Sequence, residues 1–109
     1  MNVEDIRDYA LSLPQTEEGM PFGDTVVVFK TNNKIFLLLS LDAEPLQFNV
    51  KCNPDRAVEL REAYDCIIPG YHMNKKHWNT VIVNGNLPNK FLREQILHSY
   101  QLVAPKNKR

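Results

Sequence analysis

Residues 69–79 hold the densest mixture of charged, aromatic and hydrogen-bonding side chains in this 109-residue chain. Pro69 and Gly70 form a turn dipeptide, and the residues after them include two of the three histidines, a lysine pair and the only tryptophan. Lysine ammonium groups pair with phosphates, and planar rings provide stacking surfaces. The segment is therefore the best candidate for binding an anionic partner. Its candidate residues are Tyr71, His72, Lys75, Lys76, His77 and Trp78, joined by Lys51 from an outward position on a predicted strand.

Each of these residues also has a purely structural explanation. A single tryptophan at the start of a strand, such as Trp78, more often belongs to the core than to a ligand platform. Tyr71 and His72 could close the loop by hydrogen bonds, and Lys75 with Lys76 could form a solvated hairpin tip. Their occurrence together in one loop favours the functional interpretation.

Other kinds of site have weaker support in the sequence. The chain has no nucleophile elbow, no phosphate-binding loop and no cysteine–histidine signature, so we expect a non-enzymatic protein without a cofactor. His72 and His77 are five residues apart, a spacing that fits neither helix nor strand pairing of metal ligands, so we expect no metal site. The acids Glu4, Asp5 and Asp8 predict a solvated helix face, and a metal site on them is the less favoured alternative.

Length and composition predict one soluble domain over residues 1–109. Hydrophobic residues make up 43% of the chain, yet no apolar run approaches the roughly 20 residues that span a bilayer. The acidic N-terminus lacks the features of a signal peptide, so we expect a cytoplasmic protein without membrane contact. Cys52 and Cys66 are predicted to be buried thiols rather than a disulfide.

The net charge is zero, but the charges are unevenly distributed along the chain. Residues 1–24 carry six acids and one base, whereas residues 71–109 carry seven bases and one acid. This asymmetry could give a basic face for an anionic partner, or the two ends could lie side by side and neutralise each other. Residues 104–109 are expected to form a flexible basic tail.

The periodicity of apolar residues predicts helices over 3–13, from 54 to about 64, and from 88 to about 104. Strands are predicted over 25–30, 34–41, 46–51 and 80–84, with a short apolar segment at 66–68 and a loop over 14–24. The order of helix, three strands, helix, strands and helix indicates an α+β fold, with an antiparallel sheet and helices mainly on one face. The strict alternation in 46–51 predicts that one side of the sheet is open to solvent.

Three further residues are candidates for lining a ligand pocket or anchoring a loop. Phe22, held between Pro21 and Gly23, is predicted to anchor its loop on the core, with display for stacking as the alternative. Ser99 lies on the apolar stripe of the last helix, where its hydroxyl is expected to bond back to the preceding turn. Tyr100 could reach the sheet edge.

The chain resembles the MmcQ/YjbR family of small bacterial proteins, from Val3 to about Val103. The resemblance implies a CyaY-like α+β fold with a double-wing element, and DNA binding. Its most specific part is residues 69–79. The other shared motifs are Pro21-Phe22-Gly23, Lys34-Ile35-Phe36, Lys51 followed by Asn53-Pro54, Leu60-Arg61-Glu62 and Ser99-Tyr100.

We therefore expect a DNA-binding module that contacts phosphates through its basic and aromatic loop. Its sequence preference should be weak, because no segment resembles a recognition helix that reads base edges. One alternative is an adaptor that uses the same surface on an acidic protein partner. Another is a small-ligand pocket lined by Phe22, Tyr71, His72 and Trp78.

Overall fold

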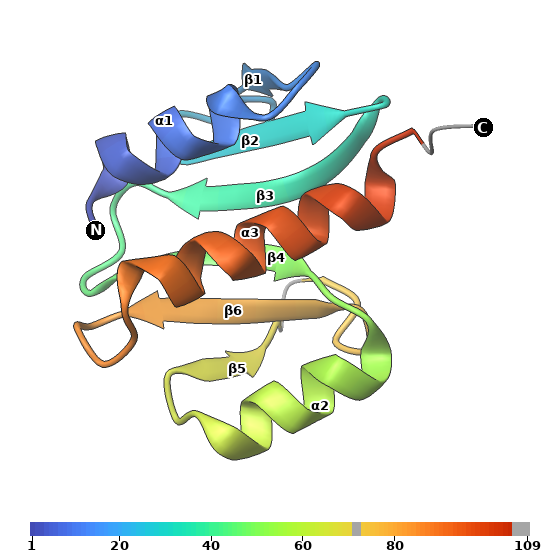
Figure 1. The fold of residues 1–109 in the computed structure, drawn as a ribbon. Helices are drawn as coiled ribbons and strands as arrows, with labels where there is room; N and C mark the ends of the chain where they lie inside the picture. Colours follow the sequence, from blue (N-terminus) through green and yellow to red (C-terminus); the bar gives the residue numbers. More distant parts are fainter. Residues whose placement is uncertain (71–72, 106–109) are drawn as a thin grey trace.

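The computed structural model describes residues 1–70 and 73–105. This part of the chain folds into three helices and a six-stranded sheet, which confirms the predicted α+β class. Figure 1 shows how these elements are arranged. In chain order the elements are α1 (Val3–Ser12), β1 (Glu17–Gly19), β2 (Val26–Thr31), β3 (Lys34–Ser40), β4 (Leu46–Lys51), α2 (Pro54–Ala63), β5 (Ile67–Pro69), β6 (Trp78–Val83) and α3 (Asn89–Val103). The predicted tail falls mostly on residues 106–109, outside the described residues.

The sheet is antiparallel throughout, with the strand order β1-β2-β3-β4-β6-β5. The strands β2, β3 and β4 form the predicted meander, and β6 adds next to β4 after the α2 crossover. The prediction that residues 14–24 form only a loop was wrong in one respect, because Glu17–Gly19 pairs with β2 as an edge strand. Three exposed residues containing a glycine carry no hydrophobic alternation, so the pattern gave no signal for this strand.

Local sequence signals account for the ends of several elements. Asn2 caps α1 in a capping box with Asp5, and Asn53 caps α2 with Pro54 at its first position. The β2–β3 hairpin turns on Asn32 and Asn33, whose φ angles of 55° and 61° suit a tight turn of the primed kind. Asparagine suits both kinds of position, because its side chain accepts from free backbone N–H groups at a helix start and the residue tolerates positive φ.

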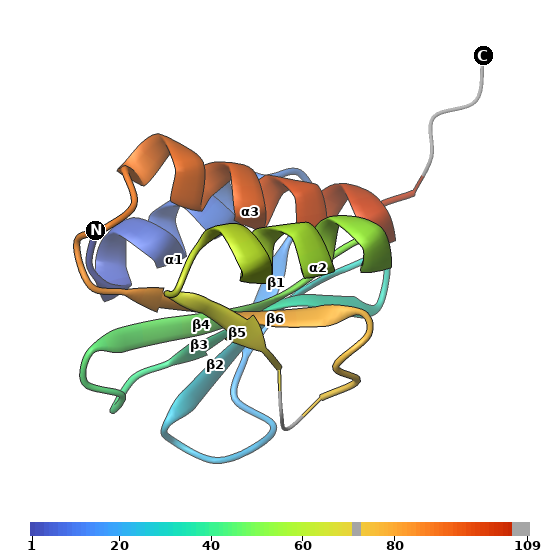
Figure 2. The ribbon, with the colours of Figure 1, turned by 90° about the horizontal axis from the view of Figure 1, so that it is seen from below.

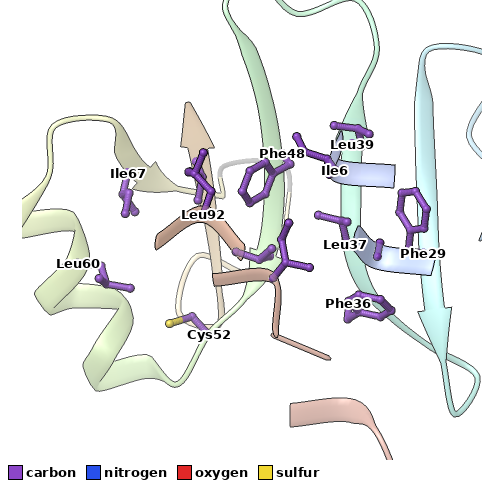
Figure 3. Close-up of a cluster of buried hydrophobic side chains, with 14 of the residues drawn as sticks. Ile6, Phe29, Phe36, Leu37, Leu39, Phe48, Cys52, Leu60, Ile67 and Leu92 are labelled. Atoms are coloured by element: carbon purple, nitrogen blue, oxygen red, sulfur yellow. The ribbon is translucent and has the colours of Figure 1, made fainter. Parts of the chain in front are cut away.

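All three helices pack on one face of the sheet, as Figure 2 shows. The main core lies between the helices and this face, and Figure 3 shows how Phe29, Leu37 and Phe48 of the sheet meet Ile6 of α1 and Leu92 of α3. Each of these side chains is at most 2% exposed. Cys52 and Cys66 are buried free thiols, as predicted.

The helix-covered face also brings the two ends of the chain together. The helices α1 and α3 lie side by side (Figure 1), so the acids of α1 and the bases Lys90 and Arg93 of α3 share one side of the molecule. One ion pair on this side joins Arg7 Nη2 and Glu18 Oε2 at 2.5 Å. The hydrogen bond from Arg7 lowers the pKa of the Glu18 carboxyl. The acidic helix α1 and the basic residues of α3 are thus neighbours in space, while the ion pair itself joins two residues of the acidic end.

Candidate functional site

The face of the sheet opposite the helices carries two loops, which Figure 2 shows projecting on the same side. The first connects β1 to β2 over residues 20–25, and the second connects β5 to β6 over residues 70–77. We call this helix-free face the open face. The prediction that one side of the sheet lies open is confirmed, because Gln47, Asn49 and Lys51 of β4 are partly exposed there while Phe48 and Val50 are buried.

A close backbone approach builds the β5–β6 loop. Gly70 N donates to Trp78 O at 2.9 Å, and Met73 N donates to Gly70 O at 2.9 Å. A Cβ atom at position 70 would lie 3.0 Å from Trp78 Cβ and 3.2 Å from Trp78 O. Only glycine fits this contact without a shift of the neighbouring strand. The predicted Pro69-Gly70 turn was wrong, because Pro69 ends β5 and Gly70 extends its pairing with β6.

Asn74 organises the second half of the same loop. Its carbonyl oxygen accepts hydrogen bonds from His77 N at 3.0 Å and Trp78 N at 2.9 Å. Its side-chain Oδ1 accepts from Lys76 N at 2.9 Å. The asparagine therefore holds a tight turn that presents Lys75 and Lys76 to solvent.

Arg61 of α2 connects the loop to the body of the protein, a role that sequence reasoning missed. Its Nη1 donates to Asn79 Oδ1 at 2.8 Å and to Lys75 O at 3.1 Å. Asn79 is 1% exposed, so its oxygen depends on this partner. The sequence shows only that this arginine follows Leu60, a residue of the apolar stripe of the predicted helix. That position does not identify the acceptors of its hydrogen bonds.

Trp78 belongs to a small second core beneath the open face rather than to an exposed stacking platform. It is 9% exposed and lies with Val28 and Leu38, against which Met73 and Ile35 pack. This burial agrees with the structural explanation offered for Trp78, a core tryptophan at the start of a strand, and leaves little of the ring accessible to a partner. The physical reason is that the loop folds back over the sheet and covers the ring.

A groove of about 430 Å³ runs over the open face between the two loops. Phe22 borders it from the β1–β2 loop and Met73 from the β5–β6 loop. Its floor combines apolar and uncharged polar side chains from three neighbouring strands, namely Val26, Ile35, Leu38, Ser40, Gln47 and Asn49. No carboxylate is among the described residues that line it.

The polar part of the floor is fixed by a cross-strand pair. Asn49 of β4 lies opposite Thr80 of β6, and the Thr80 hydroxyl donates to Asn49 Oδ1. Gln47 lies two residues from Asn49 and therefore points to the same face. The groove thus offers two amide groups beside an apolar surface, a composition that suits a planar ligand with polar edges.

Phe22 is 61% exposed, so the prediction that it anchors its loop on the core was wrong. The flanking Pro21 and Gly23, with Gly23 at φ 108°, turn the loop away from the sheet instead. The alternative interpretation, display of the ring, agrees with its position at the rim of the groove. The predicted pocket composition is only partly recovered, because Trp78 is not among the lining residues.

The structure brings several predicted basic residues to one end of the open face. Lys51 lies opposite Trp78 across β4 and β6, and Cys52 N donates to His77 O at 2.7 Å, so Lys51 adjoins the loop that carries Lys75 and Lys76. Lys75 and Lys76 are exposed, while Lys51 and His77 are partly exposed. Tyr71 and His72 lie outside the described residues.

Two acids also lie on the side of the open face. Glu17 of β1 lies opposite Lys30 of β2 in the strand register at the edge of the sheet. Asp24 is exposed in the β1–β2 loop. Both lie toward β1, whereas Lys51, Lys75 and Lys76 lie toward β6. The open face therefore has a margin of mixed charge toward β1, where Lys30 lies beside Glu17, and a basic margin toward β6, on either side of an uncharged groove.

Ser99 and Tyr100 hold the scaffold together and do not line the groove. Ser99 Oγ donates to Phe36 O at 2.5 Å and accepts from Lys51 N at 2.8 Å, so its predicted bond to the preceding turn was wrong. Packing against two strands gives this buried hydroxyl better partners than its own helix. The Tyr100 ring packs edge-on against Phe36 of β3, and its hydroxyl donates to Pro14 O at 2.6 Å, in the segment between α1 and the edge strand β1.

Titratable groups with shifted pKa values lie behind the open face. Burial raises the pKa of the Cys52 thiol, against the opposing charges of Arg56 and Arg61. Burial and then the charge of Arg56 lower the pKa of the His98 imidazole. His98 Nε2 accepts from Asn53 N at 3.3 Å, which requires the neutral ring.

Metal-ligand clusters and membrane-spanning helices are both absent from the described residues. Residues 1–70 and 73–105 contain no group of three or more histidine, cysteine or acidic side chains that could hold a metal ion. Within the same part of the chain, no helix is long and apolar enough to cross a membrane. The candidate site is the groove with its basic margin, which the lining residues and the strand register define.

Comparisons with known proteins agree with this architecture. The chain is 41% identical over 102 residues to the uncharacterized protein YbdF of Escherichia coli O157:H7, covering 93% of this chain and 83% of that protein. It is 25% identical to the uncharacterized protein YjbR of Escherichia coli K12, covering 100% and 95% of the two chains.

Solved structures show the same fold. A crystal structure of a Deinococcus radiodurans protein matches with a TM-score of 0.89 at 39% identity, covering 94% of this chain and 78% of that one. A crystal structure of a Pseudomonas syringae protein matches with a TM-score of 0.81 at 31% identity, covering 94% and 99%. The YjbR family model matches residues 11–102, and the chain therefore belongs to the MmcQ/YjbR family.

Proposed function

We propose that this protein is a non-enzymatic, cytoplasmic DNA-binding module that uses the open face and the β5–β6 loop. The observation that supports the proposal best is the basic margin formed by Lys51, Lys75 and Lys76 beside a groove that no described carboxylate lines. Lysines of this kind contact phosphates and supply affinity that does not depend on sequence.

The arrangement also explains why sequence preference should be weak. Helices read bases when they lie in the major groove, but all three helices here pack on the opposite face of the sheet (Figure 2). The open face offers strands and loops but, among the described residues, no helix that could read base edges. Contacts between its lysines and the phosphate backbone of DNA therefore dominate. We expect modest affinity, because three lysines make few phosphate contacts.

Fluorescence anisotropy of labelled DNA tests the proposal. The wild type is compared with Lys75→Ala/Lys76→Ala and with a matched variant, Lys90→Ala/Arg93→Ala, which removes the same charge from the helix-covered side. Circular dichroism establishes that each variant is folded. We expect binding that weakens with salt, and a salt slope on duplex DNA that falls by about 0.9 per lost phosphate contact only in the loop variant.

Two results would contradict the proposal. The wild type could fail to bind both duplex and single-stranded DNA at low salt, or the loop variant could bind like the helix-side variant. A saturable interaction with an acidic protein, in the absence of DNA binding, would instead support the adaptor interpretation. The loop variant would then lose affinity for that protein.

A further inference from the structure

The groove on the open face has a more specific composition than phosphate binding requires. Its volume of about 430 Å³ lies within the roughly 300–1,000 Å³ that is usual for small-ligand sites. Backbone phosphates are held by lysines at a surface and need no apolar cavity. We therefore asked what part of a nucleic acid could occupy an apolar groove that carries an aromatic rim and two amides.

Phe22 supplies an accessible aromatic face. The residue is 61% exposed, and it lines the groove together with the apolar side chains of Leu38 and Val26. Bases stack on aromatic side chains in single-stranded complexes, and this contact tolerates any base because every base has a π-face. Because most of Phe22 is accessible to solvent, its ring can stack on a planar ligand that enters the groove.

Asn49 and Gln47 supply polar groups for the edge of the same ligand. Because Asn49 Oδ1 accepts from the Thr80 hydroxyl, its Nδ2 protons remain as donors at the floor of the groove. Gln47 adds both a donor and an acceptor two residues away on the same face. Side-chain amides hydrogen-bond well to base edges, since they present a donor and an acceptor side by side.

The charge distribution indicates on which side of the groove the phosphates of a bound strand would lie. Lys51 lies two residues beyond Asn49 on the same face of β4, and Lys75 and Lys76 follow Met73 in the loop that borders the groove. A base in the groove therefore has lysines on its β6 side, where the phosphates of its own strand can lie. Toward β1 the face carries Glu17 and Asp24 together with Lys30, so its positive charge is concentrated on the β6 side.

We propose that the groove binds an unstacked base of single-stranded DNA, stacked on Phe22 and hydrogen-bonded by Asn49 and Gln47. This proposal rests on the proposed DNA-binding function and narrows it from DNA in general to single strands. A duplex keeps its bases stacked in pairs, so it can offer neither a base face to Phe22 nor a whole base to the groove.

The test compares one labelled strand with its duplex, for the wild type and three variants of the β1–β2 loop. Phe22→Ala removes the ring, Phe22→Trp keeps an aromatic face, and Met20→Ala is the matched control, because Met20 is an exposed apolar residue of the same loop that does not line the groove. Unlabelled nucleoside monophosphate serves as a competitor. Exposure of both positions keeps the effect of the substitutions on folding small.

We expect the wild type to prefer the single strand, and Phe22→Ala to lose about 5-fold to 150-fold in affinity for it. Phe22→Trp and Met20→Ala should bind the strand like the wild type. Equal affinity for the duplex, or an unchanged Phe22→Ala, would overturn this inference and leave the proposed function standing. Competition by the free nucleotide at matched base concentration would also overturn this inference. A failure to bind either the strand or the duplex would overturn both the inference and the proposed function.

Discussion

Arg61→Met tests how the β5–β6 loop is held in place. The substitution removes hydrogen bonds from Arg61 Nη1 to Lys75 O and to Asn79 Oδ1 but keeps a long apolar stem. Water can replace the bond at Lys75 O, which is exposed. The bond at Asn79 Oδ1 cannot be replaced so easily, because Asn79 is 1% exposed.

The expected magnitude follows from this difference. Leaving a buried acceptor unpaired costs about 1–3 kcal/mol, so we expect Arg61→Met to lower the free energy of unfolding by about 2 kcal/mol. That is a substantial part of the roughly 5–15 kcal/mol that stabilises a typical domain. Urea denaturation followed by circular dichroism measures the change.

The matched control is Arg56→Met, an exposed arginine of the same helix, which should change the free energy of unfolding by less than about 0.5 kcal/mol. A double-mutant cycle with Asn79→Ala should give a coupling energy of about 1–2 kcal/mol. A coupling energy near zero, or equal effects of Arg61→Met and Arg56→Met, would refute this account of the loop.

Three further substitutions test other contacts of the scaffold. Gly70→Ala should lower the free energy of unfolding by about 1–3 kcal/mol, because the added Cβ would meet the Trp78 backbone. Denaturant titration measures this change, and an unchanged midpoint would rule out the close approach. Ser99→Ala should cost about 1–3 kcal/mol in the same assay by leaving Phe36 O and Lys51 N without their partner, whereas the exposed Ser12→Ala should cost much less. The pKa of His98 is lower in the folded protein than in the unfolded chain, so the unfolded chain binds more protons. The contribution of neutral His98 to stability is therefore fully present above pH 6.5 and should be lost as the pH falls through the folded-state pKa. His98→Gln should flatten this part of a stability–pH profile, and an identical profile would exclude His98 as its source.

Much of the fold follows from local patterns that the sequence carries directly. Strict alternation in residues 46–51 predicts the bounds of β4, and Asn32-Asn33 predicts the hairpin turn. These features depend on near neighbours in the chain. The edge strand β1 depends instead on pairing with β2, and its three exposed residues carry no pattern of their own.

The candidate site was only partly predictable, because its residues are positioned by distant contacts. The sequence identified Lys51, Lys75 and Lys76 and the loop that carries two of them. It did not show that Trp78 is covered, that Phe22 is displayed, or that Arg61 reaches across to the loop, since each outcome depends on how the loops fold over the sheet. The groove amides Gln47 and Asn49 were visible only as outward strand positions.

The most direct test of the central claim is a map of backbone amide chemical shifts during titration with DNA. The account predicts that shifts concentrate on Gln47, Asn49 and Thr80, on the loop over 73–77 and at Phe22. The helices α1 and α3 on the opposite face should change little. Shifts confined to those helices, or no shifts at low salt, would contradict DNA binding through the open face.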